Sequence, residues 1–332
     1  RDHLLVVSRT SSNAIYVLDA LTGEPLRSLN VPGTVVTGGT FVVSMIACSD
    51  DGQVFAANLT TDGNTTPFKI YHWANDDSTE VPTLIFSGNP GGGTSDRWGD
   101  TLDARGSGVD VDLLMGGRNG KLTACIFFAP DADLRRLLTI ITPDAETANF
   151  GLGITFGRGN TFWGKATGTG LRQVSFDPET GAGTVITTIT NYNNMAPIDF
   201  YPTRNLLAGI SIETPDNVRL LDVTGGSVLE LDTKFFSDFP NSNGAGQARF
   251  GNERLFVLDA NNGIVAYALR PKIRASFNAG TVTLDWDGIY NLQFSPEAAG
   301  PYTNLVNEPP HVFEPAQLSP GSRGFFRLAP IQ

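Results

Sequence analysis

Short apolar runs separated by turn residues extend from one end of the chain to the other. Within these runs the apolar side chains occupy alternate positions, as in the segment Ile15 to Asp19. This period of two is typical of β-strands with one buried face. Helical periodicity is nearly absent, and the best helical candidate, Asp131 to Leu138, is short. The pattern therefore predicts an all-β fold.

A recurring hairpin is the most informative pattern in the sequence. In each copy a strand ends at an aspartate, a few small or polar residues follow, and a glycine closes the turn. The copies are residues 15–23 (IYVLDALTG), 173–181 (QVSFDPETG), 218–226 (VRLLDVTGG) and 256–263 (FVLDANNG). The aspartate can accept hydrogen bonds from N–H groups of its own turn, and glycine supplies positive φ at Gly23, Gly181, Gly226 and Gly263.

Four-strand units can be laid out around these hairpins. The expected strands are 195–202, 206–213, 218–223 and 228–233 in the clearest unit, 150–156, 161–165, 171–176 and 183–190 in a second, and 41–49, 54–59, 68–73 and 83–86 in a third. The repeat length is about 45 to 55 residues, which is typical of β-propeller blades. Residues 1–30 and 245–270 supply three strands each. We expect six blades, with five or seven as the alternatives.

The pattern changes after residue 270. The expected strands 273–277, 281–286, 289–294 and 324–328 lack the Asp–Gly hairpin, and a proline-rich stretch runs from Pro296 to Pro320. We therefore expect a β-propeller at residues 1–270 and a small C-terminal β-sandwich at residues 271–332. A domain of about 60 residues is short for a sandwich, so it needs support from the propeller, from further residues or from a neighbouring molecule.

The charge balance excludes one class of partner. The chain has 23 Lys and Arg residues against 34 Asp and Glu residues, a net charge of −11. Nucleic acids and anionic membranes need a basic surface, so neither is expected as a partner. No apolar run is long enough for a transmembrane helix. The two cysteines, Cys48 and Cys125, lack metal-site or redox-motif spacing, which leaves either one disulfide or two buried thiols.

The most polar stretch, residues 97–112, is the candidate ligand-binding site. Its side chains are Trp98, Asp100, Asp103, Arg105, Asp110 and Asp112. Asp110 and Asp112 share one face of a strand, where two carboxylates could bind a cation or act as an acid–base pair. The competing interpretation is an exposed blade edge on which the arginines are counter-charges.

The remaining candidates for chemistry are scattered. The histidines His3, His72 and His311 are far apart in the sequence, and no nucleophile elbow, metalloprotease motif or phosphate-binding loop occurs. The tryptophans could stack on sugar rings or fill blade interfaces; they are Trp73, Trp98, Trp163 and Trp286. Asp199 and Tyr201, with Asp110 and Asp112, are the candidates for an axial catalytic site. No cofactor is expected, although Asp50-Asp51-Gly52 and the loop at Asp259 leave a structural calcium ion open.

Several long segments resemble a known family. Residues 97–120 (RWGDTLDARGSGVDVDLLMGGRNG), 150–168, 205–223 and 254–269 resemble an uncharacterised family of secreted bacterial β-propellers. Residues 284–307 and 324–330 are similar to a small C-terminal β-sandwich found behind exported bacterial domains. The resemblance implies a propeller and export, but no activity or site residues. Many relatives carry a membrane-spanning sorting tail after the sandwich, and we expect it to be absent or removed after Gln332.

These observations favour a secreted, non-enzymatic structural or interaction protein. We expect it to assemble with copies of itself as a filament or surface layer, or to act in adhesion, through β-edge contacts of the C-terminal domain or the N-terminal strand. The first alternative is an extracellular propeller that binds polysaccharide. A glycan lyase or hydrolase is the second alternative, since propellers host such enzymes on the axial face.

Overall fold

The fold is built from β-strands. The computed structural model of the chain describes residues 3–9, 13–91, 95–118, 123–128, 136–140, 150–165, 168–226, 228–237, 239–241, 244–269, 273–278, 281–286, 290–306, 309–313 and 324–330. In these residues the helical content is two single turns, η2 (Pro202–Arg204) and η3 (Thr224–Gly226). The helix considered at 131–138 is wrong where it can be checked, because residues 136–140 form a strand and 131–135 lie outside the described residues.

The chain divides into two compact units. Unit 1 comprises Arg1–Pro202 and Leu206–Ala266, and unit 2 comprises Thr203–Asn205 and Tyr267–Gln332. In the described residues no helix is long and apolar enough to cross a membrane.

Unit 1 contains six small antiparallel sheets in chain order. The three-stranded sheets are β1 (His3–Val7), β2 (Ile15–Asp19) and β3 (Pro25–Ser28) at the start, and β20 (Gly246–Gly251), β21 (Arg254–Asp259) and β22 (Gly263–Ala268) at the end. The four-stranded sheets are β4 (Phe41–Cys48), β5 (Val54–Leu59), β6 (Phe68–Trp73) and β7 (Thr83–Gly88); β8 (Asp103–Ser107), β9 (Asp110–Gly116), β10 (Thr123–Phe128) and β11 (Arg136–Ile140); β12 (Gly153–Phe156), β13 (Thr161–Lys165), β14 (Leu171–Phe176) and β15 (Gly183–Ile189); and β16 (Met195–Tyr201), β17 (Leu206–Ser211), β18 (Asn217–Asp222) and β19 (Leu229–Phe235).

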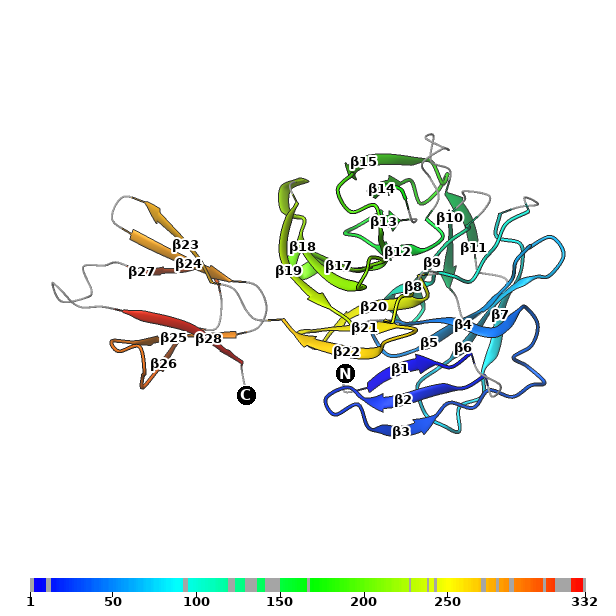
Figure 1. The fold of residues 1–332 in the computed structure, drawn as a ribbon, viewed down its shortest axis with the longest axis horizontal. Helices are drawn as coiled ribbons and strands as arrows, with labels where there is room; N and C mark the ends of the chain where they lie inside the picture. The colour runs from blue at the N-terminus through cyan, green and yellow to red at the C-terminus, as the bar shows by residue number, and fades with distance from the viewer. Residues whose placement is uncertain are drawn as a thin grey trace. The chain divides into compact units, whose positions relative to one another are not determined.

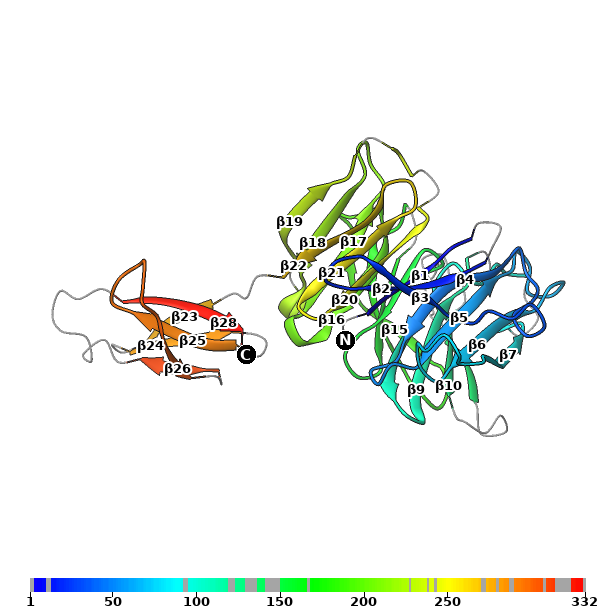
Figure 2. The same cartoon turned by 90° about the horizontal axis from the view of Figure 1, so that it is seen from below.

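Five strands lie toward the middle of unit 1. We call β4, β8, β12, β16 and β20 the lead strands, because each begins its sheet and packs against the lead strand of the next sheet, from β4 through to β20. The later strands of these sheets, such as β7, β15 and β19, lie farther out (Figures 1 and 2). Side chains of adjacent sheets form the core between them.

The core consists of apolar clusters, each filling the space between two consecutive sheets. Phe55, Phe68, Trp98 and Leu113 belong to the cluster between sheets β4–β7 and β8–β11. Corresponding clusters fill the next two interfaces along the chain and the interface between β1–β3 and β4–β7. The sheets β4–β7, β8–β11 and β12–β15 are therefore stabilised by burying apolar side chains on both of their faces.

The predicted Asp–Gly hairpins form as the sequence indicated. Asp177 Oδ1 accepts hydrogen bonds from the backbone N–H groups of Glu179 and Thr180 at 2.7 and 3.0 Å, and Asp19 Oδ1 accepts from Leu21 and Thr22 at 2.8 and 2.7 Å. The hydrogen bond from Glu179 lowers the pKa of Asp177. Gly23, Gly181 and Gly263 have positive φ as expected, but in the third copy Gly225, and not Gly226, takes this conformation, because a 3-10 turn shifts the position.

Unit 2 consists of two three-stranded sheets, in the orders β23-β24-β27 and β26-β25-β28. Their strands are β23 (Ile273–Asn278), β24 (Thr281–Trp286), β25 (Tyr290–Ser295), β26 (Thr303–Val306), β27 (His311–Phe313) and β28 (Phe325–Pro330). The strands β26 and β27 lie within the proline-rich stretch and were not expected. Leu284, Trp286, Tyr290 and Leu292 form the core of the unit.

Candidate functional site

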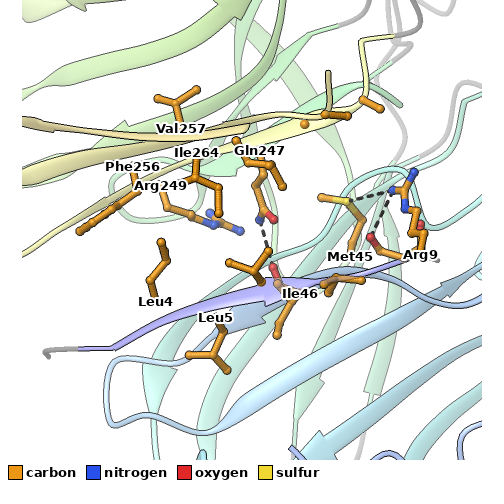
Figure 3. A pocket seen from close by; sticks show the side chains of 17 residues that line it. Leu4, Leu5, Arg9, Met45, Ile46, Gln247, Arg249, Phe256, Val257 and Ile264 are labelled. Carbon is orange, nitrogen blue, oxygen red and sulfur yellow. Dashed lines mark hydrogen bonds between the residues drawn. The ribbon is translucent and has the colours of Figure 1, made fainter. Parts of the chain in front are cut away.

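A cavity lies beside β1, between the first and last sheets of unit 1. Its volume is about 260 Å³, and its lining is mostly apolar. The lining comes from β1, β4, β20, β21 and β22, with Arg9, Ala245 and Ala260 from flanking segments. Figure 3 shows Leu4 on the side of β1 that faces Phe256, with Gln247 and Arg249 projecting from β20. The Gln247 side-chain amide donates to the carbonyl oxygen of Ile46 at 3.0 Å, so a side chain bridges β20 and β4 here.

One edge of β1 borders this cavity and is not paired with another strand of the described sheets. β1 pairs antiparallel with β2 alone, with Leu5 opposite Val17 and Val6 opposite Tyr16. Just beyond the strand, Ser8 N–H donates to Ala14 O at 2.8 Å. Because bonded and non-bonded pairs alternate along antiparallel strands, Leu4 and Val6 bond to β2, and the backbone groups of Leu5 and Val7 point to the free edge.

The position of β1 corresponds to the second strand of the other sheets. The β2–β3 hairpin carries the same turn as β14–β15 and β18–β19, which are third and fourth strands, and as β21–β22, which are second and third strands. The direction of β1 decides between these positions. Arg9, after the end of β1, contacts Ser44 O near the start of β4, while His3, at the beginning of β1, bonds to Asp76 after the end of β6. β1 thus runs opposite to β4, as second strands run opposite to lead strands.

The burial of β1 differs from that of the second strands, and its unpaired edge explains the difference. Every residue of the second strands β5 and β17 is buried, because a lead strand and a third strand flank each of them. In β1, His3 is exposed and the other four residues are only half-buried. Among the described residues the first sheet therefore consists of β1, β2 and β3, and the cavity borders the unpaired edge of β1.

A buried ion network joins three lead strands next to the cavity. Arg249 Nη1 lies 2.6 Å from Asp103 Oδ1 and 3.1 Å from Asp199 Oδ1, and Nη2 donates to Leu102 O at 2.8 Å. The side chain of Arg249 is 27% exposed, whereas Asp103 and Asp199 are 8% and 7% exposed. Although burial acts against it, the two carboxylates hold the pKa of Arg249 above its ordinary value.

Side chains on β8, β12 and β16 also accept hydrogen bonds from backbone N–H groups of the lead strand that follows. Asp103 Oδ2 accepts from Phe156 N–H at 2.6 Å, and Asp199 Oδ2 accepts from Phe250 N–H at 2.6 Å. Thr155 Oγ1 accepts from the N–H of Phe200 at 3.3 Å and donates to Asp199 Oδ1 at 3.0 Å. Burial raises the pKa of Asp199 to about 6, and the charge of Asp103 adds to this, while Arg249 and the hydrogen bonds oppose it. The network holds the lead strands together.

Arg9 places a positive charge at the end of the cavity where β4 begins. Its guanidinium donates to Ser44 O at 3.2 Å and lies 5.3 Å from the centre of the Phe41 ring. No carboxylate of the described residues forms an ion pair with it. Burial lowers its pKa, with Asp100 opposing and Arg97 adding to the shift. The site can therefore accept a negative charge.

The structure separates the members of the predicted ligand site. Trp98 is fully buried in the core between two sheets, so it cannot stack on a sugar. Asp100 pairs with Arg97 at 2.6 Å and faces Arg118 at 3.8 Å. Asp103 points instead into the Arg249 network.

The remaining members lie elsewhere on the same sheet. Asp112 pairs with Arg105 at 2.8 Å, whose guanidinium also covers the Phe156 ring at 4.2 Å. Asp110, at the start of β9, is exposed. Asp103 and Arg105 therefore meet the same neighbouring strand at Phe156, and Asp112 pairs with Arg105 there. Trp98, Asp100 and Asp110 lie in the core, beside Arg97 and in solvent, so the structure does not bring all six residues together.

The other three tryptophans and the two cysteines lie on strands of the sheets. Trp73, Trp163 and Trp286 are buried like Trp98. Cys48 and Cys125 are free thiols on β4 and β10, so the disulfide considered between them is not formed, and burial raises the pKa of the Cys125 thiol.

The acidic loop at Asp50-Asp51 is a contact between sheets. Asp51 accepts from Ser49 Oγ at 2.6 Å and from Gly108 N–H at 2.8 Å, and Asp50 accepts from Gly106 N–H at 2.9 Å. The hydrogen bond from Ser49 and that from Gly108 lower the pKa of Asp51 to about 2. No group of three or more metal-binding side chains occurs in the described part of the chain.

Sequence reasoning missed Arg9, Thr155 and Arg249. A signal for two of them exists, because Thr155-Phe156, Asp199-Phe200 and Arg249-Phe250 are each a polar residue followed by phenylalanine on a lead strand. The dipeptide is too short to stand out before the strands have been aligned.

The comparisons with known proteins give one family match, which covers the N-terminal third of the chain. Residues 2–113 match the family described as a domain of unknown function (DUF4623). A crystal structure of a DUF4623 family protein from Bacteroides eggerthii is 15% identical, with 86% of this chain and 67% of that chain covered and a TM-score of 0.54. No curated protein matches the chain.

Two further solved structures match the chain. The structure of U3-55K is 11% identical, with 80% of this chain and 91% of that chain covered and a TM-score of 0.50. The RRP9 WD40 repeats are 12% identical, with 81% and 77% covered and a TM-score of 0.49. At these identities the likeness to the DUF4623 family protein and to U3-55K concerns the fold alone, an all-β chain of small antiparallel sheets.

Proposed function

We propose that unit 1 is a six-bladed β-propeller, and that the chain is a secreted, non-enzymatic interaction protein. In this proposal it assembles with copies of itself or adheres to other molecules, and unit 2 is a small β-sandwich. The observation that carries the proposal is the free edge of β1 beside an apolar cavity. Such an edge recognises a polypeptide through main-chain hydrogen bonds.

The buried charges support this role over catalysis. Asp103 and Asp199 both pair with Arg249 and accept hydrogen bonds from backbone groups of neighbouring strands. Asp100 and Asp112 likewise pair with arginines of their own sheet. The burial of the four tryptophans gives the alternative of a polysaccharide-binding site no support.

Light scattering coupled to size exclusion, followed by electron microscopy, tests the proposal. We expect the intact chain to form concentration-dependent assemblies, or to be retained on a surface of extracellular proteins. A chain that stays monomeric at every concentration and binds no protein surface would contradict it.

A further inference from the structure

We propose that Asp216, Asn241 and Asp259 form a binding site for a calcium ion between the sheets β16–β19 and β20–β22. The inference goes beyond the proposed interaction role and does not depend on it. The three residues are buried, with exposed fractions of 1%, 2% and 0%. Two of them carry a carboxylate, so negative charge is held away from bulk solvent at this interface.

The two carboxylates have no cationic partner among the described residues. Asp216 accepts hydrogen bonds from two backbone N–H groups at 3.2 and 2.7 Å. Asp259 Oδ1 accepts from the Asn261 N–H at 3.0 Å and from the side-chain amide of Asn262 at 3.1 Å. All of these donors are neutral. Because a buried charge without a counter-charge is costly, a bound cation would stabilise the folded chain.

Two buried oxygen atoms beside these carboxylates lack a hydrogen-bond donor in the described part of the chain. They are Asp259 Oδ2 and Asn241 Oδ1. The Nδ2 atom of Asn241 donates to the carbonyl oxygen of Ala245 at 2.6 Å, which leaves Oδ1 as the unbonded atom of the amide. Buried polar atoms are nearly always bonded to protein, water or an ion. Carboxylate and amide oxygens are the ligands that calcium prefers.

The unbonded oxygens face the same interface. Asp259 lies opposite Gly246 in the β20–β21 pair, and opposite residues of such a pair point to one face. A Cβ atom at Gly246 would lie 2.9 Å from Ile210 Cδ1 on β17, so this face is turned toward the sheet β16–β19. Asn241 spans the interface, because its N–H bonds to Asp216 just before β18 and its side chain bonds to the carbonyl just before β20.

The equivalent aspartates of the other hairpins have different surroundings. Asp177 is exposed, and Asp19 and Asp222 are half-buried, so water reaches their carboxylates. Asp259 occupies the same position in its hairpin but is fully buried. The turn therefore accounts for Oδ1 of Asp259, and it leaves Oδ2 for a ligand.

The donor set also fits a hard divalent cation. It contains two carboxylates and one amide, and so differs from a group of three acidic, histidine or cysteine side chains, which the described residues do not contain. Calcium takes about six to eight oxygen ligands and completes them with backbone carbonyls and water. An ion at this place would link the last sheet of unit 1 to the sheet before it, and would stabilise the folded chain by mass action.

Calcium titration of the intact chain, after treatment with a chelator, tests the site. We expect about one ion per chain by isothermal titration, with a Kd of about 10⁻⁴ M, since two carboxylates supply the charge. About 10 mM calcium chloride should raise the Tm by about 3–8 °C, whereas potassium chloride of equal ionic strength should not. Magnesium should bind at least about tenfold more weakly, because it demands near-ideal octahedral geometry.

Three variants make the test specific. Asp259→Asn and Asp216→Asn keep the side-chain shape and remove one charge, so each should weaken calcium binding at least about tenfold and abolish the Tm shift. The matched control is Asp177→Asn, which changes the exposed aspartate of an equivalent hairpin and should keep the wild-type response. In chelator, Asp259→Asn should have a Tm equal to or above that of the wild type, because it removes an uncompensated buried charge.

The outcomes decide the inference separately from the proposed function, whose readout is assembly. Absence of calcium binding and of a Tm shift in the wild-type chain would overturn the site. Equal calcium responses in the wild type, Asp259→Asn and Asp216→Asn would place the ion elsewhere and would overturn it as well. If Asp259→Asn fails to fold, the wild-type titration and Asp216→Asn still give the answer.

Discussion

The first sheet, β1–β3, and the fourth four-stranded sheet, β16–β19, use the same hairpin in different surroundings. In the sheet β16–β19, a lead strand covers β17, and every residue of β17 is buried. In the sheet β1–β3 the corresponding strand, β1, faces a cavity and is half-buried. A repeat of local sequence therefore does not guarantee the same surroundings for the neighbouring strand. Among the described strands, β1 has an unpaired edge next to the cavity, whereas β17 is paired on both sides.

The lead strands differ from β1 in having a polar position that ties them together. Asp103, Thr155, Asp199 and Arg249 form one connected network on β8, β12, β16 and β20. The described strands of the sheet β1–β3 contribute no side chain to it. The network should thus stabilise unit 1, whereas substitutions of residues that line the cavity should change the free energy of unfolding less.

Arg249→Met should have the largest effect. It leaves Asp103 and Asp199 buried without a cation, and breaking a buried ion network on one side costs about 3–5 kcal/mol. Urea unfolding of unit 1 would measure the loss. The matched control in the same unit is Lys234→Met, which removes an exposed ion pair with Asp232 and should cost about 0–1 kcal/mol. Equal losses would show that the network contributes no special stability.

Truncating a fully buried side chain on β17 should reduce stability more than truncating a half-buried side chain on β1. Leu207→Ala on β17 removes a fully buried side chain and should cost about 2–5 kcal/mol. Leu4→Ala on β1 removes a half-buried side chain beside an existing cavity and should cost about 1 kcal/mol. The same unfolding experiment compares them. A larger loss of stability in Leu4→Ala than in Leu207→Ala would contradict the half-buried position of β1 beside the cavity.

The raised pKa of Asp199 should appear as a pH dependence of stability. Between its ordinary value of 3.8 and about 6 the folded chain binds more protons at this carboxyl than the unfolded chain does. The free energy of unfolding from this group therefore falls as pH rises through that window, by at most about 1.4 kcal/mol per pH unit. Asp199→Asn should remove this contribution. Identical pH profiles for the two chains would disprove it.

Substitutions in the Asp–Gly turns should have the smallest effect on stability, and the effect should be the same in the β2–β3 turn as in the β14–β15 turn. Asp177→Ala and Asp19→Ala each free two backbone N–H groups of an exposed turn. Hydrogen exchange should accelerate at these amides, with a change in Tm below about 2 °C. If Asp19→Ala alone destabilised the whole first sheet, the hairpin would instead be needed for the stability of β1–β3.

The strands of the four-stranded sheets could be predicted closely from the sequence, and the candidate site could not. Segments such as Thr161–Lys165 and Leu171–Phe176 were expected at their observed bounds, because alternation of apolar residues is a local signal. Strands β26 and β27 were missed because prolines interrupt their pattern. The six residues of the polar stretch were expected to act together, and they do not, since successive side chains enter different interfaces.

The sequence by itself determined the all-β class, the Asp–Gly turns and the change of pattern near residue 270. These features depend on residues within a few positions of one another, whose hydrogen bonds and alternation hold in any surroundings. The tertiary structure alone decided that Arg249 meets Asp103, 146 residues away, and that β1 borders a cavity with Arg9 at its end. Such contacts arise from the order in which sheets pack around a centre, and no local pattern encodes that order.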